Sequence, residues 1–228
     1  MGCLFCASTI GGKIRNLRTS EMLEQIYMIQ KDLDTKINSI VIMGSGEPFD
    51  NFENVEKFIN IITSEKSMNI SKRKMTISTC GIIEKIYEAA DKELHFNLAV
   101  SLHASSQSKR DYLIPVSKKY PIEEIIKACD YFSNKTGRRI TYEYILINGF
   151  NDTREDAQNL ISLLKKSNCL VNLIPLNPIN EFVGEAPSNK NILEFQKILK
   201  NNKINSTIRR ELGRDIDAAC GQLRRKNI

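Results

Sequence analysis

The chain has 228 residues, of which 41% are hydrophobic and 26% charged, and its formal net charge is +6. This composition excludes a disordered or low-complexity protein, because there are enough apolar residues to bury a core and neither glycine nor proline is enriched. No apolar run reaches the ~20 residues that span a bilayer and the N-terminus has no signal-peptide pattern, so we expect a cytosolic protein with no membrane partner.

The predicted elements alternate between helix and strand along the chain. Apolar side chains at helical spacing predict a first helix at 19–31, and a buried strand follows at 37–43. Further on, the pattern predicts a helix at 52–63, a strand at 74–78, a helix that ends near residue 90, a strand at 96–101 and then a polar loop. The second half is predicted as a helix at 121–135, a strand at 140–146, a helix that ends near 166, a strand at 170–174, a helix at 189–201 and a short strand at 206–209.

Repeated strand–helix units of this kind indicate parallel strands joined by right-handed crossovers. Such strands form either an open doubly wound sheet or part of a barrel. Polar or glycine-rich segments follow four of the predicted strands, at 44–48, 78–81, 101–103 and 177. Barrel enzymes place their sites at the carboxyl ends of the strands, so four strand ends that converge on one ligand favour a barrel.

Two cysteines at the start of the chain, Cys3 and Cys6, have the spacing of a soft-metal site. In a reducing compartment, thiols so close together indicate metal or redox chemistry rather than a disulfide scaffold. A zinc or thiol-redox protein remains an alternative, although no second ligand pair at zinc spacing is present. Cys129 and Cys169 have no thiol or histidine nearby in the sequence, and we expect them to be small buried apolar residues.

Positive charge is concentrated near the C-terminus. The basic side chains there are Arg209, Arg210, Arg214, Arg224, Arg225 and Lys226. Charge alone favours a solvated basic terminus, but a polyanionic partner such as RNA also fits it.

Six segments, in order over nearly the whole chain, carry a resemblance to a known family. They are Gly2-Cys3-Leu4-Phe5-Cys6-Ala7, Met43-Gly44-Ser45-Gly46-Glu47-Pro48, Ile77-Ser78-Thr79-Cys80-Gly81, Ser101-Leu102-His103-Ala104, the run 172–178 (NLIPLNP) and the run 215–223 (DIDAACGQL). With them the chain resembles the radical S-adenosylmethionine (SAM) enzymes, and within these the RlmN and Cfr group, which methylates an adenine carbon in ribosomal RNA. One Cys-x2-Cys motif would be weak support, whereas the ordered set is specific.

The resemblance implies a partial (β/α)6 TIM-like barrel of the radical SAM type whose first strand is missing. In that family a Cys-x3-Cys-x2-Cys motif holds a [4Fe–4S] cluster, and the open iron binds SAM. Cys3 and Cys6 match the second and third cysteines, and the first would lie two residues upstream of Met1. The implied domain organisation is a radical SAM core over 1–228 with an RNA-binding and active-site tail from about 204, and without the family's N-terminal helical domain.

The resemblance also assigns binding roles to residues at the strand ends. Gly46 and Glu47 would approach the amino group of SAM, because a glycine admits the ligand and a carboxylate accepts from an ammonium. Asn177 would lie on the adenine side. The contacts to the ribose and the amino acid part are implied for Ser78, Ser101 and His103, together with Leu102 of the same motif. Cys80 departs from the family pattern, and we interpret it as a packing residue rather than a replacement ligand.

Cys220 lies among small residues and is bracketed by arginines. Its local sequence alone favours a buried helix cysteine. The resemblance instead implies that one SAM methylates this thiol and that a second SAM yields a 5′-deoxyadenosyl radical, which takes a hydrogen from the S-methyl group. The resulting carbon radical adds to the adenine ring. A radical is implied because the amidine carbon of adenine is electrophilic and does not attack a sulfonium methyl. A second cysteine, upstream of this chain, then resolves the adduct between protein and RNA. The target base must be unstacked, as is usual in RNA recognition.

The leading hypothesis is therefore a methyltransferase that acts on carbon 2 of an adenine in 23S ribosomal RNA and, in some relatives, in transfer RNA. The expected reductant is an electron donor such as flavodoxin or ferredoxin, and the expected state is a monomer. Two alternatives stay open: the carbon 8 activity of the Cfr branch, and a non-catalytic fragment that binds SAM or RNA. With two of three cysteines, residues 1–228 are expected to assemble little cluster.

Overall fold

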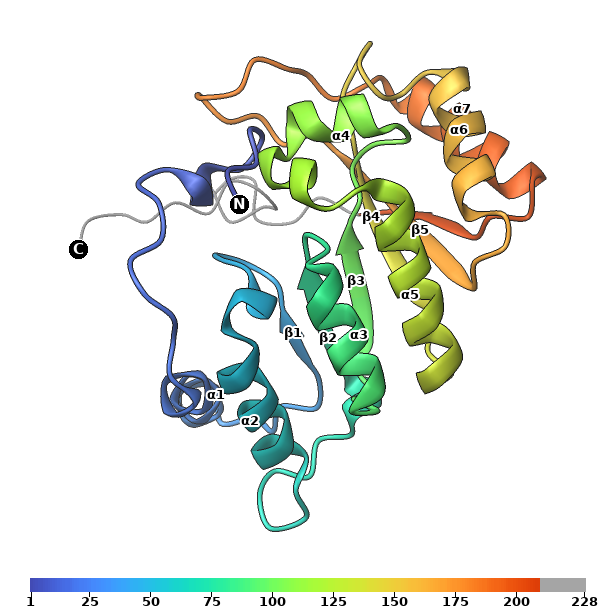
Figure 1. Ribbon diagram of the computed structural model, residues 1–228. Helices are drawn as coiled ribbons and strands as arrows, with labels where there is room; N and C mark the ends of the chain where they lie inside the picture. Colours follow the sequence, from blue (N-terminus) through green and yellow to red (C-terminus); the bar gives the residue numbers. More distant parts are fainter. Residues whose placement is uncertain (210–228) are drawn as a thin grey trace.

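The computed structural model describes residues 1–209 (Figure 1). Cys220 and the basic side chains that follow Arg209 lie outside the described residues. Six strands form one sheet: β1 (Ile40–Ile42), β2 (Met75–Thr79), β3 (Asn97–Ser101), β4 (Ile140–Leu146), β5 (Cys169–Pro175) and β6 (Ser206–Ile208). They lie in the order of the sequence, and every neighbouring pair is parallel.

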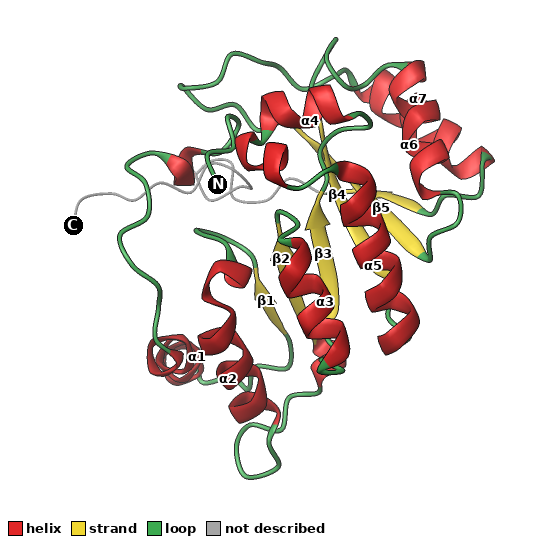
Figure 2. Ribbon diagram, viewed as in Figure 1, coloured by secondary structure: helices red, strands yellow, loops and turns green. Residues whose placement is uncertain are grey.

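Seven α-helices join or flank these strands in the described part of the chain (Figure 2). They are α1 (Thr19–Leu33), α2 (Phe52–Thr63), α3 (Ile83–Asp91), α4 (Gln107–Leu113), α5 (Ile122–Thr136), α6 (Arg154–Leu164) and α7 (Asn189–Asn201). None of them is both long and apolar enough to cross a membrane.

The strand order identifies the sheet as part of a barrel. A doubly wound sheet reverses its order at a switch point, whereas strands that succeed one another without reversal keep their crossover helices on one face and curve toward closure. The predicted partial barrel of parallel strands is therefore confirmed. Among the described residues β1 pairs only with β2, and Val41 of β1 is 64% exposed. This open edge is where the missing first strand of the prediction would pair.

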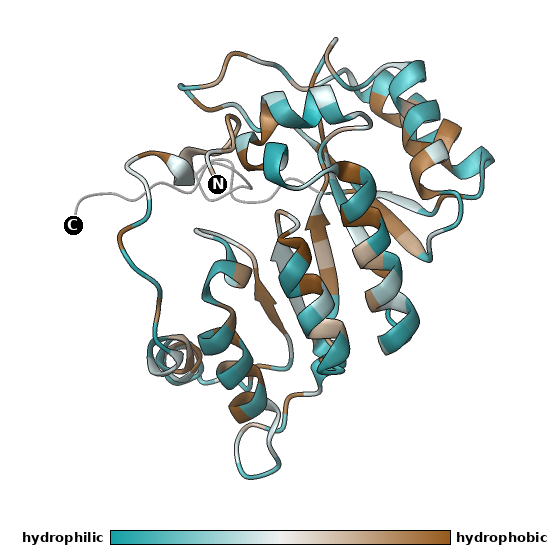
Figure 3. Cartoon of the chain, viewed as in Figure 1, coloured by the Kyte–Doolittle hydropathy of each residue, from teal (hydrophilic) through white to brown (hydrophobic). Residues whose placement is uncertain are grey.

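The buried apolar side chains within residues 1–209 form two clusters. The larger one lies between the sheet and its helices, and β4 contributes Ile140, Tyr142, Tyr144 and Leu146 to it. In Figure 3 the hydrophobic strands stand behind helices whose outward faces are hydrophilic. The smaller cluster gathers Phe5, Leu113, Ile114, Ile145, Ile147 and Leu176. It joins the start of the chain to the carboxyl ends of the strands.

Most predicted elements agree with the structure, and one expectation is wrong. Helices α2 and α7 have the predicted bounds, and the six predicted strands are present with shifts of a few residues at their ends. The polar loop expected after β3 instead contains α4, followed by a 3-10 helix at Pro115–Lys119. The helix is short, and its buried side includes a charged residue, Arg110, so its sequence has no apolar stripe.

Candidate functional site

The cysteine loop at the start of the chain docks on α4 and on the end of β3. The Leu4 N–H donates to the carbonyl of Leu113, the last residue of α4, at 3.0 Å. Between the two cysteines, Phe5 is buried and its ring stands edge-on to the His103 ring, with 4.9 Å between the centroids. The loop is thereby held over the carboxyl edge of the sheet.

Local hydrogen bonds shape the loop that carries Cys3 and Cys6. The Cys6 N–H donates to the Cys3 carbonyl at 3.3 Å, and the Thr9 hydroxyl donates to the Cys6 carbonyl at 2.9 Å. Both thiols are partly exposed. Burial and the neighbouring Cys6 thiol raise the pKa of Cys3 to about 11, while the positive charges of the N-terminus and of Arg110 act in the opposite direction.

The donor set at this loop fits a soft metal or an iron–sulfur group in part. Two thiols at this spacing are suitable ligands for iron–sulfur clusters and for zinc. Within residues 1–209, however, no three His, Cys, Asp or Glu side chains are placed so that they could share one metal ion. Cys3 and Cys6 can therefore provide two ligands of such a group, and further ligands must come from elsewhere.

Glu47 joins the loops that follow β1 and β2. Its carboxylate accepts from the Phe49 N–H at 3.0 Å and, across the site, from the Cys80 N–H at 2.7 Å. Burial raises the pKa of this carboxyl, and these hydrogen bonds oppose the shift. The carboxylate thus has a structural role that its motif does not reveal, although its remaining lone pairs can still accept from a ligand. Gly46 before it has φ +96°, and nothing lies within 4 Å of where a Cβ would be.

His103 is held as a neutral hydrogen-bond donor. Its Nδ1 accepts from the Ile145 N–H at 3.0 Å, so the ring proton must reside on Nε2. Burial lowers the pKa of His103 to about 3, and the nearby Arg110 adds to the shift. The backbone has φ +59°, and the buried Asn151 amide donates to the His103 carbonyl at 2.9 Å. The residue is therefore fixed in place, and its Nε2–H is the group that it can offer to a ligand.

The other residues predicted to bind the cofactor fall into two groups. Ser78 and Ser101 are partly exposed near the ends of β2 and β3, and Asn177 is buried two residues after β5. In contrast, the Leu102 side chain is fully buried in the large core. Its N–H donates to the Glu143 carbonyl and its own carbonyl accepts from Arg110, so both of its backbone groups are engaged within the protein.

Arg110 of α4 is a site residue that the sequence prediction missed. It is fully buried, and its guanidinium donates to the carbonyls of Ser101, Leu102 and Cys80, each at 2.6 Å. One side chain thus ties the end of β3 to the loop after β2. The only sign of this role in the sequence is that Arg110 lies three residues before Leu113 and four residues before Ile114, the spacing of one helix face.

A second missed feature is a row of polar side chains across the inner face of the sheet. Ser101, Glu143, Asn172 and Thr207 occupy matching register positions on β3, β4, β5 and β6. The Asn172 amide donates to Glu143 at 2.8 Å, and the Thr207 hydroxyl donates to Asn172 at 3.1 Å. Burial raises the pKa of Glu143. In the sequence, this row is indicated by the carboxyl of Glu143 in the middle of a buried strand.

The other three cysteines within residues 1–209 are buried, as predicted for packing residues. Cys129 and Cys169 are buried in α5 and β5, and burial raises the pKa of Cys129 to about 12. Cys80 is also buried, and its Sγ lies 3.5 Å from the Met1 Sδ. Burial, followed by the negative charge of Glu47, raises its pKa, so this thiol is protonated at neutral pH.

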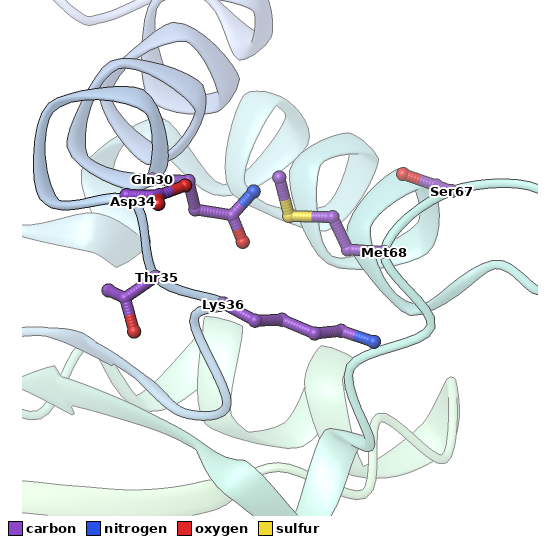
Figure 4. A pocket seen from close by; sticks show the side chains of 6 residues that line it. All are labelled: Gln30, Asp34, Thr35, Lys36, Ser67 and Met68. Atoms are coloured by element: carbon purple, nitrogen blue, oxygen red, sulfur yellow. The ribbon is translucent and has the colours of Figure 1, made fainter.

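Two surface hollows lie at opposite edges of the sheet. One, of about 620 Å³, adjoins Asn177 beyond the ends of β5 and β6 and is lined by Leu176, Pro178, Ile192 and Arg209 among others. The other, of about 440 Å³, is lined by the six side chains drawn in Figure 4. Its residues Lys36 and Met68 precede β1 and β2, so it lies at the amino edge, away from the cysteine loop. None of the residues predicted to bind the cofactor or the cluster lines either hollow.

Comparison with known families gives one match that covers most of the chain. A family model described as the Radical SAM superfamily matches residues 1–164. A probable dual-specificity RNA methyltransferase RlmN of Clostridium beijerinckii is 55% identical over 228 residues. A protein of the same description from Lachnospira eligens is 51% identical over 226 residues. The chain spans 65% of the length of each of these two relatives, slightly less than two thirds.

Solved structures give the same result. The crystal structure of a radical SAM methyltransferase from Sphaerobacter thermophilus superposes with a TM-score of 0.94 at 42% identity, over 98% of this chain and 66% of that one. Streptococcus suis SuiB bound to S-adenosylmethionine superposes with a TM-score of 0.65 at 15% identity, over 96% of this chain and 52% of that one. At that identity the second likeness concerns the fold alone.

Proposed function

We propose that this chain, which belongs to the radical SAM superfamily, is the barrel of an RNA methyltransferase that modifies carbon 2 of an adenine in 23S ribosomal RNA and in transfer RNA. The observation that carries the proposal is the identity of 55%, over the entire chain, to a relative described as a dual-specificity RNA methyltransferase. The proposed domain arrangement is the radical SAM core with an RNA-binding tail from about residue 204.

The proposed cofactors are a [4Fe–4S] cluster and SAM. Cys3 and Cys6 would hold the cluster together with a cysteine upstream of residue 1. When bound, the two cofactors supply a carbon-centred radical, a species that ordinary side chains cannot generate. The proposed reductant is flavodoxin or ferredoxin.

The residues of the chain would bind and orient SAM at the carboxyl edge of the sheet. The Nε2–H of His103 is a neutral donor at every pH near neutrality, so it suits an oxygen acceptor of the ligand. Glu47 has lone pairs left for an ammonium group, and Gly46 leaves the space beside it open. Ser78, Ser101 and Asn177 would add polar contacts, whereas Leu102 serves the fold.

Cys220, which lies outside the described residues, is the proposed methyl carrier. A thiol that is methylated and then donates its carbon is required because the target carbon of adenine is not nucleophilic. The small residues around it, Ala218, Ala219 and Gly221, form the motif that carries this assignment.

The test is methylation of 23S ribosomal RNA and transfer RNA by the chain extended upstream with the corresponding residues of the Clostridium beijerinckii relative. We expect 2-methyladenine in nucleoside analysis by mass spectrometry, and none from the Cys220→Ala variant. Cys129→Ala, which removes a buried packing thiol, is the matched control and should retain activity. Product at carbon 8, or activity that survives Cys220→Ala, would contradict the proposal.

A further inference from the structure

Arg110 carries a buried positive charge that no carboxylate of the described residues neutralises directly. It is 0% exposed, its Nη atoms donate to three backbone carbonyls, and its Nε has no hydrogen-bond partner. Carbonyl dipoles solvate a guanidinium only in part, and a buried charge is costly unless it is paired. Burial lowers the pKa of Arg110 to about 10, which still leaves it protonated at neutral pH.

The acidic side chains near α4 are engaged elsewhere. Asp111 accepts from Gln107 at 2.6 Å and from Ser117. Asp156 pairs with Lys109 at 2.7 Å. Glu47 is linked to Arg110 only through the Cys80 peptide, whose N–H faces the carboxylate and whose carbonyl faces the guanidinium.

The charge of Arg110 lies close to the cysteine loop. Helix α4 carries both the guanidinium and, one turn later, the Leu113 carbonyl that receives the Leu4 N–H. Arg110 also donates to the Cys80 carbonyl, and the Cys80 Sγ lies 3.5 Å from the Sδ of Met1, two residues before Cys3. The unpaired cation is thus tied on both sides to residues that contact the segment carrying the candidate ligand Cys3.

We propose that Arg110 is a built-in counter-charge for an anionic iron–sulfur cluster bound by Cys3 and Cys6, and that it favours the reduced form of that cluster. This inference rests on the proposed function. A cluster gains negative charge when it accepts an electron, and a fixed cation in a poorly hydrated site stabilises the more negative state. Net charge and hydrogen bonding around a cluster are established determinants of its reduction potential. Arg110 would accordingly act as a tuning residue, without touching the substrate.

The experiment measures the cluster's reduction potential, without RNA, in the chain extended upstream to restore the third cysteine. Dye-mediated titration under anaerobic conditions, followed by electron paramagnetic resonance of the reduced cluster, gives the midpoint. We expect Arg110→Gln, which keeps an amide donor but loses the charge, to hold about tenfold less reduced cluster at a fixed potential, a negative shift of ~59 mV for one electron. Arg110→Lys keeps the charge and should remain near the parent value.

The matched control is Lys119→Met, which removes an exposed positive charge from the 3-10 helix that follows α4. Water and salt screen such a charge, so the potential should not change. An Arg110→Gln cluster with an unchanged or more positive potential would overturn the inference and leave Arg110 as a structural brace.

Two further outcomes are also decisive. If Arg110→Gln retains no cluster, the Arg110→Lys variant distinguishes the two explanations. An Arg110→Lys cluster with a potential near the parent value supports the counter-charge. Loss of the cluster in Arg110→Lys as well overturns the inference, because the shape of the side chain is then what matters. A parent protein that binds no cluster would overturn the proposed function as well. If the parent binds a cluster and Arg110→Gln leaves its reduction potential unchanged, this inference alone is overturned.

Discussion

At the scale of single residues, the site combines groups whose charge state is set by burial. His103 is neutral and its tautomer is determined by one backbone N–H, while Arg110 is charged and solvated by carbonyls. Glu47 uses both carboxylate oxygens to join two loops. Burial thus shifts each group toward its neutral form: it lowers the pKa of His103 and Arg110 and raises that of Glu47.

His103 predicts a specific pH dependence of stability. Its pKa is about 3 in the folded protein against 6.5 for an unperturbed histidine, so the unfolded state binds the proton more tightly. The stability that the neutral His103 contributes is complete above pH 6.5 and is lost as the pH falls toward 3. The free energy of unfolding then changes by up to ~1.4 kcal/mol per pH unit. His103→Asn keeps an acceptor for the Ile145 N–H and tolerates the positive φ, but does not titrate.

The measurement is the free energy of unfolding by denaturant from pH 7 down to pH 4 for the parent and His103→Asn. We expect the parent to lose more stability than the variant over this range. Both proteins contain the same carboxyls, so the difference between their slopes isolates the histidine. Equal slopes would show that His103 is protonated as easily in the fold as in the unfolded chain.

At the scale of elements, the site depends on how tightly the loops at the strand ends pack against helices. Gly81, in the loop after β2, has φ +100°, and a Cβ there would lie 2.7 Å from the Cδ1 of Ile125 on α5. The same loop carries Cys80, which binds both Glu47 and Arg110. Helix α5 therefore determines where the middle of the site lies.

Gly81→Ala is expected to destabilise the protein through two additive causes. The backbone strain costs ~1–3 kcal/mol and the contact with Ile125 another ~1–3 kcal/mol. Gly149→Ala is the matched control, because Gly149 also has a positive φ, +70°, but nothing within 4 Å of its Cβ position, so only the strain remains.

The contact can be separated from the strain by a second substitution. Ile125→Val removes the Cδ1 atom and by itself costs ~0.5–1.5 kcal/mol. In the double variant Gly81→Ala, Ile125→Val, the loss measured by thermal or denaturant unfolding should be smaller than the sum of the two single losses. A simple sum would mean that the loop moves away from α5 at no cost.

At the scale of the whole molecule, the sheet is a barrel segment whose end strands among the described residues are β1 and β6. A cysteine loop supplies two thiols. Phe5 and Leu113 belong to the smaller apolar cluster, against which Cys3 and Cys6 pack, so apolar contacts help to hold the loop that carries the two cysteines.

This arrangement predicts the outcome of cluster reconstitution. Residues 1–228, treated anaerobically with iron and sulfide, should retain little iron–sulfur cluster, because two thiolates do not replace three. Extension upstream with residues of the Clostridium beijerinckii relative should restore it. Iron and sulfide content per chain and the visible absorption of the cluster measure both cases. A full cluster that responds to SAM in residues 1–228 alone would contradict the expectation.

The sequence predicted the strands well because their signals are local. A buried strand such as 140–146 and a helix such as 52–63 are read from side-chain periodicity within the segment itself. Helix α4 was missed for the same reason, since its buried arginine breaks that periodicity. Arg110 and the row around Glu143 depend on neighbours on other strands, and no local pattern contains that information.

The sequence by itself determined the order of the elements, the parallel barrel class and the motifs that place the chain in its family, because these depend on residues that are close together in the chain. Only the tertiary structure decided the roles within the site. Arg110 meets Cys80 across 30 positions and Ile145 meets His103 across 42. Such contacts set charge, tautomer and burial, because they depend on which groups share a poorly hydrated volume once the strands have come together.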